Sequence, residues 1–182
     1  MSQDIGNITD EELMAMIARG DKQAFNEFLL RHLQLIVNFS VRYVNDYSAA
    51  EDVAQEAFTR VWRKAVSWTS QGVSPLSWVY RITYNLCMDY LRKNDGQVNT
   101  ESSEHIDVSL TPEEHLISND KTRLLNKSLM ELPERQRSAI MLCAYQGLSN
   151  IEAASVLDCS VDALESLLSR GRRSLKKKLE SD

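Results

Sequence analysis

The chain contains few of the residues that interrupt helices. Its 182 residues include only six glycines and three prolines, so long stretches contain neither. Glycine and proline are the residues least compatible with a helix interior. Their scarcity, together with apolar residues at helical spacing, predicts an all-α protein.

Cysteine pairs and long apolar runs are also missing. Cys87, Cys143 and Cys159 form no CxxC pair, so a zinc or redox motif of that type is excluded, and we expect small buried thiols in a reducing cytosol. The three histidines are scattered, and we expect them to bind no metal.

No apolar run approaches the ~20 residues that cross a bilayer, and the first residues, MSQDIGNITDEEL, do not resemble a signal peptide. We therefore expect a cytoplasmic protein that does not insert into membranes.

Motifs of catalysis are absent as well. The sequence has no GxxxxGK loop, no HExxH and no GxSxG, and its glycines are too sparse for a phosphate-binding loop. Most carboxylates fall on the solvated faces of expected helices. We expect a protein that is not an enzyme and needs no cofactor.

Charge is unevenly distributed along the chain. The net charge of -5 combines about -1 for residues 1–94, -7 for residues 95–120 and +3 for residues 121–182. The stretch 95–115 is acidic, polar and nearly free of aromatics, which is typical of a flexible linker, although a helix could start at Thr111. We expect two small helical domains, 1–94 and 116–182, joined by the acidic linker 95–115.

Each domain is expected to contain four helices. Thr9 and Glu12 have the spacing of a capping box at the first helix, which should end at Gly20. The other helices of the first domain are expected over 22–44, 49–65 (starting at Ser48 or Ala49) and 76–94. Those of the second domain are expected over 119–131, 134–146, 150–157 and from 161 onward.

The end of the chain has the pattern of a helix-turn-helix. Ser149 and Ser160 are expected to cap two helices on either side of a turn at Asp158, a residue that tolerates the left-handed conformation. The second helix should bury an apolar stripe at Val161, Leu164, Leu168, Gly171, Leu175 and Leu179. In DNA-binding units of this kind the second helix enters the major groove, and nearby cations neutralise phosphates. The alternative is a solvated basic helix whose cations complement its dipole.

Four segments in this order and spacing resemble the group-four, extracytoplasmic-function sigma factors of bacterial RNA polymerase, in the sigma-70 family. They are residues 50–65, 75–94, 132–154 and 161–175. The resemblance covers nearly the whole chain. It implies a first domain that binds core RNA polymerase and melts the -10 promoter element, and a second domain that reads the -35 element of promoter DNA. It also implies an anti-sigma factor as antagonist.

The resemblance places the polymerase-binding surface on the third helix. The helix buries Val53, Ala57, Val61 and Ala65, and Phe58 and Trp62 are expected near the edge of its exposed face. The implied binding residues are Asp52, Gln55, Glu56, Phe58, Thr59, Arg60 and Arg63. The alternative is that Glu56 and Arg60 only support the helix as an i,i+4 pair.

The resemblance also assigns residues to the -10 element. The loop from Trp68 to Pro75 would hold a base flipped out of the stack. The implied contacts are Trp68, Thr69, Ser70, Gln71, Arg81 and Asn85. Trp78, Tyr80, Tyr84 and Tyr90 could stack on DNA, but Trp78 is expected in the core.

The last helix would read the -35 element. The implied contacts are Ser160, Asp162, Ala163, Glu165, Ser166, Ser169, Arg170, Arg172 and Arg173. The sequence departs from the usual family pattern, which has a basic residue at the position of Glu165 and an arginine at that of Leu167. Glu165 cannot pair with phosphate, although it could accept a hydrogen bond from a cytosine amino group.

Two other functions fit the same helices. A helix-turn-helix regulator could act alone on an operator, but such proteins usually dimerise, and the sequence shows no long heptad pattern. A sigma-like adaptor could bind only protein, but it would not need the cations of residues 170–178.

Overall fold

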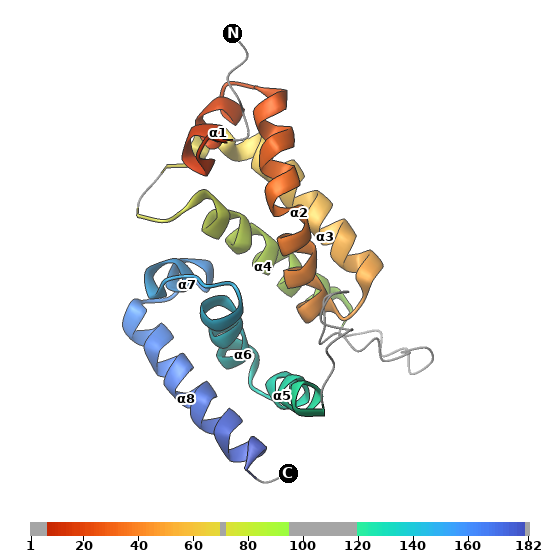
Figure 1. Ribbon diagram of the computed structural model, residues 1–182, viewed down its shortest axis with the longest axis vertical. Coiled ribbons are helices and arrows are strands. Elements are labelled where there is room, and N and C mark those ends of the chain that lie inside the picture. The colour runs from red at the N-terminus through yellow and green to blue at the C-terminus, as the bar shows by residue number, and fades with distance from the viewer. Residues whose placement is uncertain (1–6, 70–71, 95–119, 181–182) are drawn as a thin grey trace. The chain divides into compact units, whose positions relative to one another are not determined.

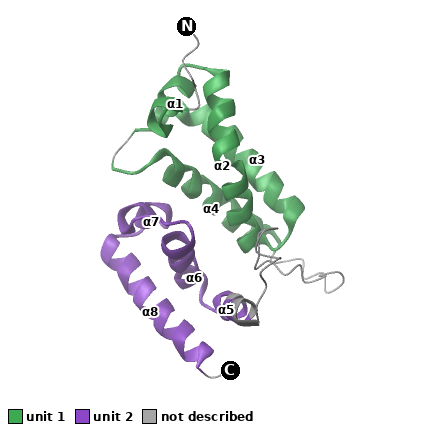
Figure 2. Cartoon of the chain, in the orientation of Figure 1, with its two compact units in different colours: residues 1–106 green, residues 107–182 purple. Residues whose placement is uncertain are grey.

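The protein is helical in both of its parts. The computed structural model describes residues 7–69, 72–94 and 120–180, and no strand occurs among them. The chain divides into two compact units, residues 1–106 and 107–182 (Figure 2). This confirms the prediction of an all-α protein with two units. The expected linker 95–115 and the helix start at Thr111 lie outside the described residues, so the domain boundaries remain predictions.

The described residues of unit 1 form four α-helices, with a short 3-10 turn after the third of them (Figure 1). Helices α2, α3 and α4 all pack on one another, and α1 lies against α2, α4 and the 3-10 turn. The elements are α1 (Asp10–Ile17), α2 (Lys22–Val44), α3 (Tyr47–Lys64), η2 (Ala65–Ser67) and α4 (Pro75–Asn94).

Local capping decides where these helices start. The capping box at Thr9 is confirmed, because its hydroxyl accepts from the Glu12 backbone N–H while Glu12 accepts from the Thr9 backbone N–H. Asn45 ends α2 in the left-handed conformation with φ of 55°. The next residue, Asp46, caps α3 by accepting from the Ala49 N–H at 2.9 Å. The third helix therefore starts one or two residues earlier than the sequence suggested.

Aromatic rings fill the core of unit 1. Phe39 contacts Tyr80 with ring centroids 5.0 Å apart, and Phe28 contacts Phe58 at 6.5 Å. Tyr80 is 1% exposed, and burial raises its pKa to about 12. Tyr84 is also buried, at 8%. The idea that Tyr80 and Tyr84 could stack on DNA is wrong, because both rings point into the core.

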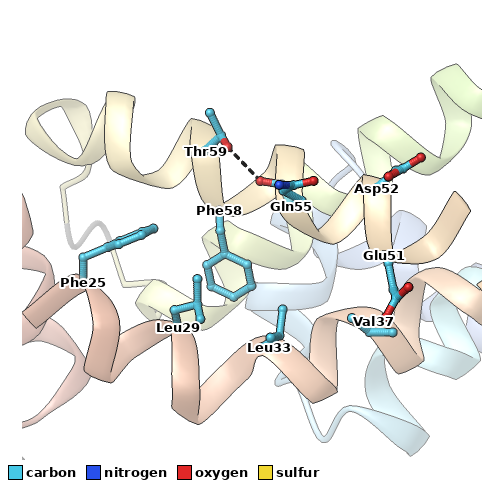
Figure 3. Close-up of a pocket in the computed structure, with 9 residues that line it drawn as sticks. All are labelled: Phe25, Leu29, Leu33, Val37, Glu51, Asp52, Gln55, Phe58 and Thr59. Carbon is cyan, nitrogen blue, oxygen red and sulfur yellow. Dashed lines mark hydrogen bonds between the residues drawn. The ribbon is translucent and has the colours of Figure 1, made fainter. Parts of the chain in front are cut away.

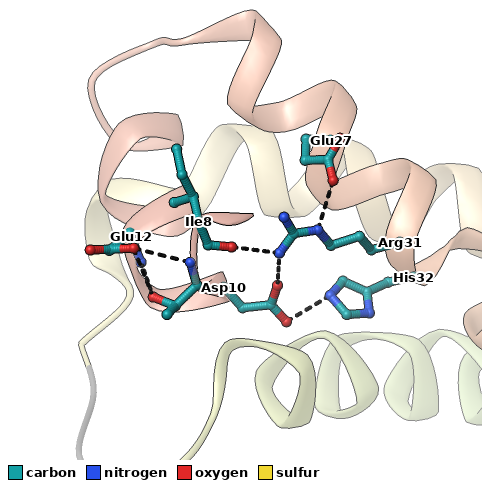
Figure 4. Close-up of polar contacts among 7 residues, drawn as sticks. Ile8, Asp10, Glu12, Glu27, Arg31 and His32 are labelled. Atoms are coloured by element: carbon teal, nitrogen blue, oxygen red, sulfur yellow. Dashed lines mark hydrogen bonds and ion pairs between the residues drawn. The ribbon is translucent and has the colours of Figure 1, made fainter. Parts of the chain in front are cut away.

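A polar cluster fastens α1 to α2 (Figure 4). The Arg31 guanidinium donates to the Ile8 carbonyl at 2.7 Å and to the Asp10 carboxylate at 3.2 Å. It also pairs with Glu27 at 2.8 Å, and the hydrogen bond to Glu27 is the main reason that the pKa of Arg31 is raised. The other Asp10 oxygen lies 2.7 Å from Nε2 of the buried His32. One carboxylate on α1 thus joins two neighbouring side chains of α2.

In unit 2, residues 120–180 form four α-helices and a π-helical turn. Helix α8 packs on α5, α6 and α7. The elements are α5 (Asp120–Met130), α6 (Glu134–Ile140), the π turn η4 (Met141–Tyr145), α7 (Asn150–Val156) and α8 (Val161–Leu179). The sequence predicted one continuous helix over 134–146. Instead, the Gln146 N–H bonds the Met141 carbonyl at 3.1 Å, a wider i→i+5 turn that apolar spacing does not distinguish from an α-helix.

The helix-turn-helix is confirmed in detail. A capping box at Ser149 starts α7, Asp158 adopts the left-handed conformation with φ of 50°, and the Ser160 hydroxyl accepts from the Ala163 N–H at the start of α8. The expected apolar stripe is only partly buried, because Leu179 is 37% exposed. The last turn of α8 instead contacts the end of α5 through a polar pair, in which Lys178 binds the Glu131 carboxylate.

The cysteines correct one expectation. Cys87 is fully buried, as expected, and burial raises the pKa of its thiol to about 12. Cys143 and Cys159 are only partly buried. Cys143 lies in the π turn η4, and Cys159 lies in the turn between α7 and α8.

Candidate functional site

An open groove lies between α2 and α3 in unit 1 (Figure 3). It has a volume of about 490 Å³, and its lining combines apolar side chains from α2 with polar side chains from α3. The lining residues are Phe25, Leu29, Leu33, Val37, Glu51, Asp52, Gln55, Phe58 and Thr59. The four residues from α2 follow one another at intervals of four, so they share one face of the helix.

Three of the polymerase-binding residues expected from the sequence line this groove with their polar groups. Asp52 and Gln55 are exposed, and Thr59 is half-buried. The Thr59 hydroxyl donates to the Gln55 backbone carbonyl at 2.9 Å. With Glu51, the groove has an acidic rim over an apolar floor.

Glu56, Arg60 and Arg63 continue the polar face of α3. The Arg60 guanidinium donates to the Glu56 carboxylate at 2.8 Å, and this bond is the main reason that the pKa of Glu56 is lowered. The i,i+4 pair considered from the sequence is therefore present. An exposed pair of this kind adds little stability, so it does not by itself explain why both residues are there.

Phe58 requires a correction. The sequence placed its ring near the edge of the exposed face of α3, but Phe58 is 2% exposed and packs on Phe28 in the core. Trp62 is half-buried and contacts Phe25 with ring centroids 5.1 Å apart. Phe58 therefore supports the groove from below.

The floor of the groove was missed by sequence reasoning. Phe25, Leu29, Leu33 and Val37 were not among the site residues predicted from the sequence. Leu33 is in fact 37% exposed. The available signal was the width of the apolar stripe on α2, which also includes Phe28 and Ile36 and is broader than one packing interface needs.

The residues expected at the -10 element are only partly described. Trp68 is half-buried, and among the described residues its indole N–H is buried without a hydrogen-bond partner. Thr69 is exposed, whereas Ser70 and Gln71 lie outside the described residues. Arg81 and Asn85 are both exposed and lie one turn apart on α4, so they share a solvent-facing side of unit 1.

The residues expected at the -35 element form the outer surface at the start and middle of α8. All nine are exposed, whereas Leu164, Leu168 and Gly171 on the other side are buried. The Ser160 hydroxyl caps the helix, so it also has a structural role. The Arg170 Nε donates to the Ser166 carbonyl at 3.2 Å.

Asn150 was not predicted as a site residue. It is the first residue of α7, and its side-chain amide donates to Glu165 Oε1 at 3.2 Å. Asn150 and Glu165 line an open hollow of about 430 Å³ with Leu168, Ser169 and Arg172. No sequence pattern pairs two residues fifteen positions apart, so only the helix crossing reveals this contact.

The described residues were also compared with the requirements of a metal site and of a membrane-spanning helix. Residues 7–69, 72–94 and 120–180 contain no group of three or more His, Cys, Asp or Glu side chains that could hold a metal ion. Within the same ranges, no helix has the length and apolarity that a bilayer crossing requires.

Comparisons with known proteins agree with both units. Residues 28–97 match the family Sigma-70 region 2, and residues 122–175 match Sigma-70, region 4. The RNA polymerase sigma-H factor of Pseudomonas aeruginosa is 31% identical over 182 residues, covering 94% of each chain. The ECF RNA polymerase sigma-E factor of Escherichia coli (strain K12) is 29% identical over 184 residues, covering 95% of each.

Two solved structures resemble the whole fold. One is CnrH in complex with the cytosolic domain of CnrY, with a TM-score of 0.71 and 25% identity over 95% of this chain and 98% of that one. The other is the sigma factor RpoE in complex with the anti-sigma factor NepR from Bartonella quintana, with a TM-score of 0.69 and 25% identity over 87% and 98% of the two chains. Together, the two family matches, the relatives and the helix-turn-helix show that the chain belongs to the extracytoplasmic-function group of the sigma-70 family, whose members direct bacterial RNA polymerase to promoters.

Proposed function

We propose that this sigma factor binds core RNA polymerase through the α2–α3 groove and reads promoter DNA with α4 and α8. The observation that carries the proposal is the separation of two kinds of surface. Unit 1 has an apolar groove with an acidic rim, and unit 2 has a cationic recognition helix.

The groove has the features of a protein-binding site. Apolar side chains of α2 are left accessible beside the acidic residues Glu51 and Asp52. Such a surface fits a helix of the polymerase that presents apolar residues flanked by lysine or arginine. Arg60 and Arg63 lie further along α3 and extend the contact with the opposite charge.

The DNA-binding assignments rest on exposure and chemistry. On α8, Arg170, Arg172 and Arg173 are exposed near the middle of the helix, where they can neutralise phosphates. Ser166 and Ser169 lie on the side opposite the buried residues, where short polar side chains can approach base edges. On α4, Arg81 and Asn85 offer a cation and an amide to the melted -10 strand.

We further propose that an anti-sigma factor controls the protein and that both act in the cytoplasm, where core polymerase and DNA are found. Two structural relatives support the first point, because the solved structures hold CnrH with the cytosolic domain of CnrY and RpoE with the anti-sigma factor NepR. A binding partner of this kind would cover the accessible apolar floor of the groove. The protein itself would perform no catalysis, since the chemistry of transcription belongs to the polymerase.

Reconstituted transcription tests the proposal. The purified chain, added to core polymerase with genomic DNA, should give run-off transcripts whose starts share -10 and -35 elements. Charge reversal at Arg170 and Arg173 should lower promoter use and leave core binding intact, whereas charge reversal at Asp52 and Glu56 should lower core binding. Full transcription by both variants would contradict the assignments.

The same experiment separates the two alternatives. A regulator acting alone would bind specific DNA without core polymerase. An adaptor would bind protein and would show no salt-dependent binding to promoter DNA, because it would make no phosphate contacts. Salt-dependent promoter binding that requires core polymerase supports the sigma factor against both.

A further inference from the structure

Glu165 lies on one flank of α8, next to α7. Leu164 and Leu168 mark the buried side of α8, and Asp162, Ser166 and Arg173 lie opposite them. Glu165 and Arg172 are seven positions apart, close to two helical turns, so both project on the same flank. The hydrogen bond from Asn150 identifies this flank as the one that faces the start of α7.

In helix-turn-helix units the second helix enters the major groove while the first crosses the DNA backbone. The flank of α8 that faces α7 is therefore the side along which phosphates pass. Arg172 is suited to this position, since it is exposed and, among the described residues, makes no hydrogen bond or salt bridge. Glu165 shares the hollow with Arg172 and presents a negative charge to the same phosphates.

The hydrogen bond with Asn150 holds this charge in place. Asn150 Nδ2 donates to Glu165 Oε1 at 3.2 Å, which restrains a side chain that would otherwise turn toward solvent. The bond also occupies one of the two N–H groups of the Asn150 amide, a donor that would otherwise be available to a phosphate oxygen. Both effects weaken the contact between protein and DNA backbone.

We propose that Glu165, positioned by Asn150, lowers the affinity of unit 2 for the DNA backbone at every sequence. The contacts of the base-reading residues and the attachment to polymerase then decide whether the -35 element is occupied. The proposal rests on the proposed function, because it takes α8 as the DNA-reading helix. It differs from a base-reading role for Glu165, which would act at one base pair only.

The test uses holoenzyme reconstituted from core polymerase and the full chain. Affinity is measured for a promoter found with the wild-type protein and for a series in which each -35 base pair is replaced, at several salt concentrations. Glu165→Gln removes one negative charge and should raise affinity about 3- to 10-fold near 0.1 M salt on all of these promoters, with a larger increase at lower salt, where the repulsion is less screened. Glu165→Arg should raise it further.

A matched control makes the same change of charge at the other end of α8, away from the contact with α7. Glu180→Gln also removes one carboxylate from the end of α8, beside Lys176, and should change affinity less than twofold. Asn150→Ala should raise affinity less than Glu165→Gln does, and should not raise it further in the Glu165→Gln background. An equal rise in both backgrounds would overturn the positioning role of Asn150.

Two results would overturn the role of Glu165. One is an affinity of Glu165→Gln holoenzyme that stays within twofold of wild type or falls. The other is a loss confined to promoters with one particular base pair, which would make Glu165 a base reader. Failure of wild-type holoenzyme to bind any promoter would instead overturn the proposed function, and the inference with it.

Discussion

Gly171 of α8 lies directly against Ile140 of α6. A Cβ added at Gly171 would be 2.9 Å from Ile140 Cδ1, 3.3 Å from Gln136 Cβ and 3.4 Å from the Gln136 carbonyl oxygen. Ile140 is buried, at 6% exposure, so its methyl group has little room to move away. Glycine therefore sets the distance at which the recognition helix packs on the rest of unit 2.

We expect Gly171→Ala to destabilise the protein. In an ordinary helix this change stabilises by about 1 kcal/mol, but here the overlap with Ile140 and Gln136 should cost about 1–3 kcal/mol. Urea unfolding and hydrogen exchange in α6 and α8 would measure the net effect. Ser169→Ala, at an exposed position of the same helix, is the control and should be neutral or slightly stabilising; a more stable Gly171→Ala protein would contradict the close packing.

Asp10→Asn should loosen α1. The Asp10 carboxylate pairs with Arg31 at 3.2 Å and lies 2.7 Å from Nε2 of His32, and the substitution removes its negative charge. Hydrogen bonds to charged groups contribute about 1.5–3 kcal/mol to stability. Because Asp10 is partly exposed, we expect a loss of about 1–2 kcal/mol in the free energy of unfolding and faster hydrogen exchange in α1.

The control for Asp10 is Glu11→Gln. Glu11 lies in the same first turn of α1 and interacts with the same helix dipole, but its side chain is exposed. Its substitution should cost less than about 0.5 kcal/mol. If both substitutions lowered the free energy of unfolding equally, the loss at Asp10 would come from the helix dipole and not from the contact with α2.

The buried thiol of Cys87 should make stability fall at alkaline pH. Its pKa is raised from 9.0 to about 12, so between these values the thiol ionises in the unfolded chain and stays protonated in the folded one. The free energy of unfolding should therefore decrease as pH rises from 9 to 12, with this group contributing a slope of up to about 1.4 kcal/mol per pH unit.

Cys87→Ala should flatten that slope, although Tyr80, with its pKa raised from 10.0 to about 12, leaves part of it in place. Chemical denaturation at several pH values is the measurement. If the free energy of unfolding of Cys87→Ala fell with pH as steeply as that of the wild type, the Cys87 thiol would not be the cause of the alkaline loss of stability.

Leu33→Asp should weaken the association with core polymerase. It places a charge on the apolar floor of the groove, and covering an unpaired charge with an apolar partner surface should reduce affinity about tenfold or more. Leu35→Asp is a matched control, because Leu35 has a similar exposure, 43% against 37%, and lies about 200° around α2 from Leu33. If the two variants bound core polymerase with equal affinity, the polymerase would bind at a surface other than the α2–α3 groove.

The sequence predicted the features that depend on neighbouring residues. Capping residues such as Thr9, Ser149 and Ser160 start helices through bonds to the next turn, and all three were recognised. The recognition helix was predicted because its turn at Asp158 and its cations lie close together in the chain. The exposed nature of Asp52, Arg81 and Arg170 also followed from helical spacing.

Contacts between distant residues were decided by the tertiary structure alone. Phe58 is buried because α2 covers it, Leu33 is accessible because none of the described residues of unit 1 covers the groove, and Asn150 meets Glu165 because α7 crosses α8. Spacing within one helix shows which residues share a face, but not which neighbour packs on that face. The helices and their outer residues were therefore determined by the sequence, whereas the groove and the Asn150–Glu165 pair depend on how the helices pack.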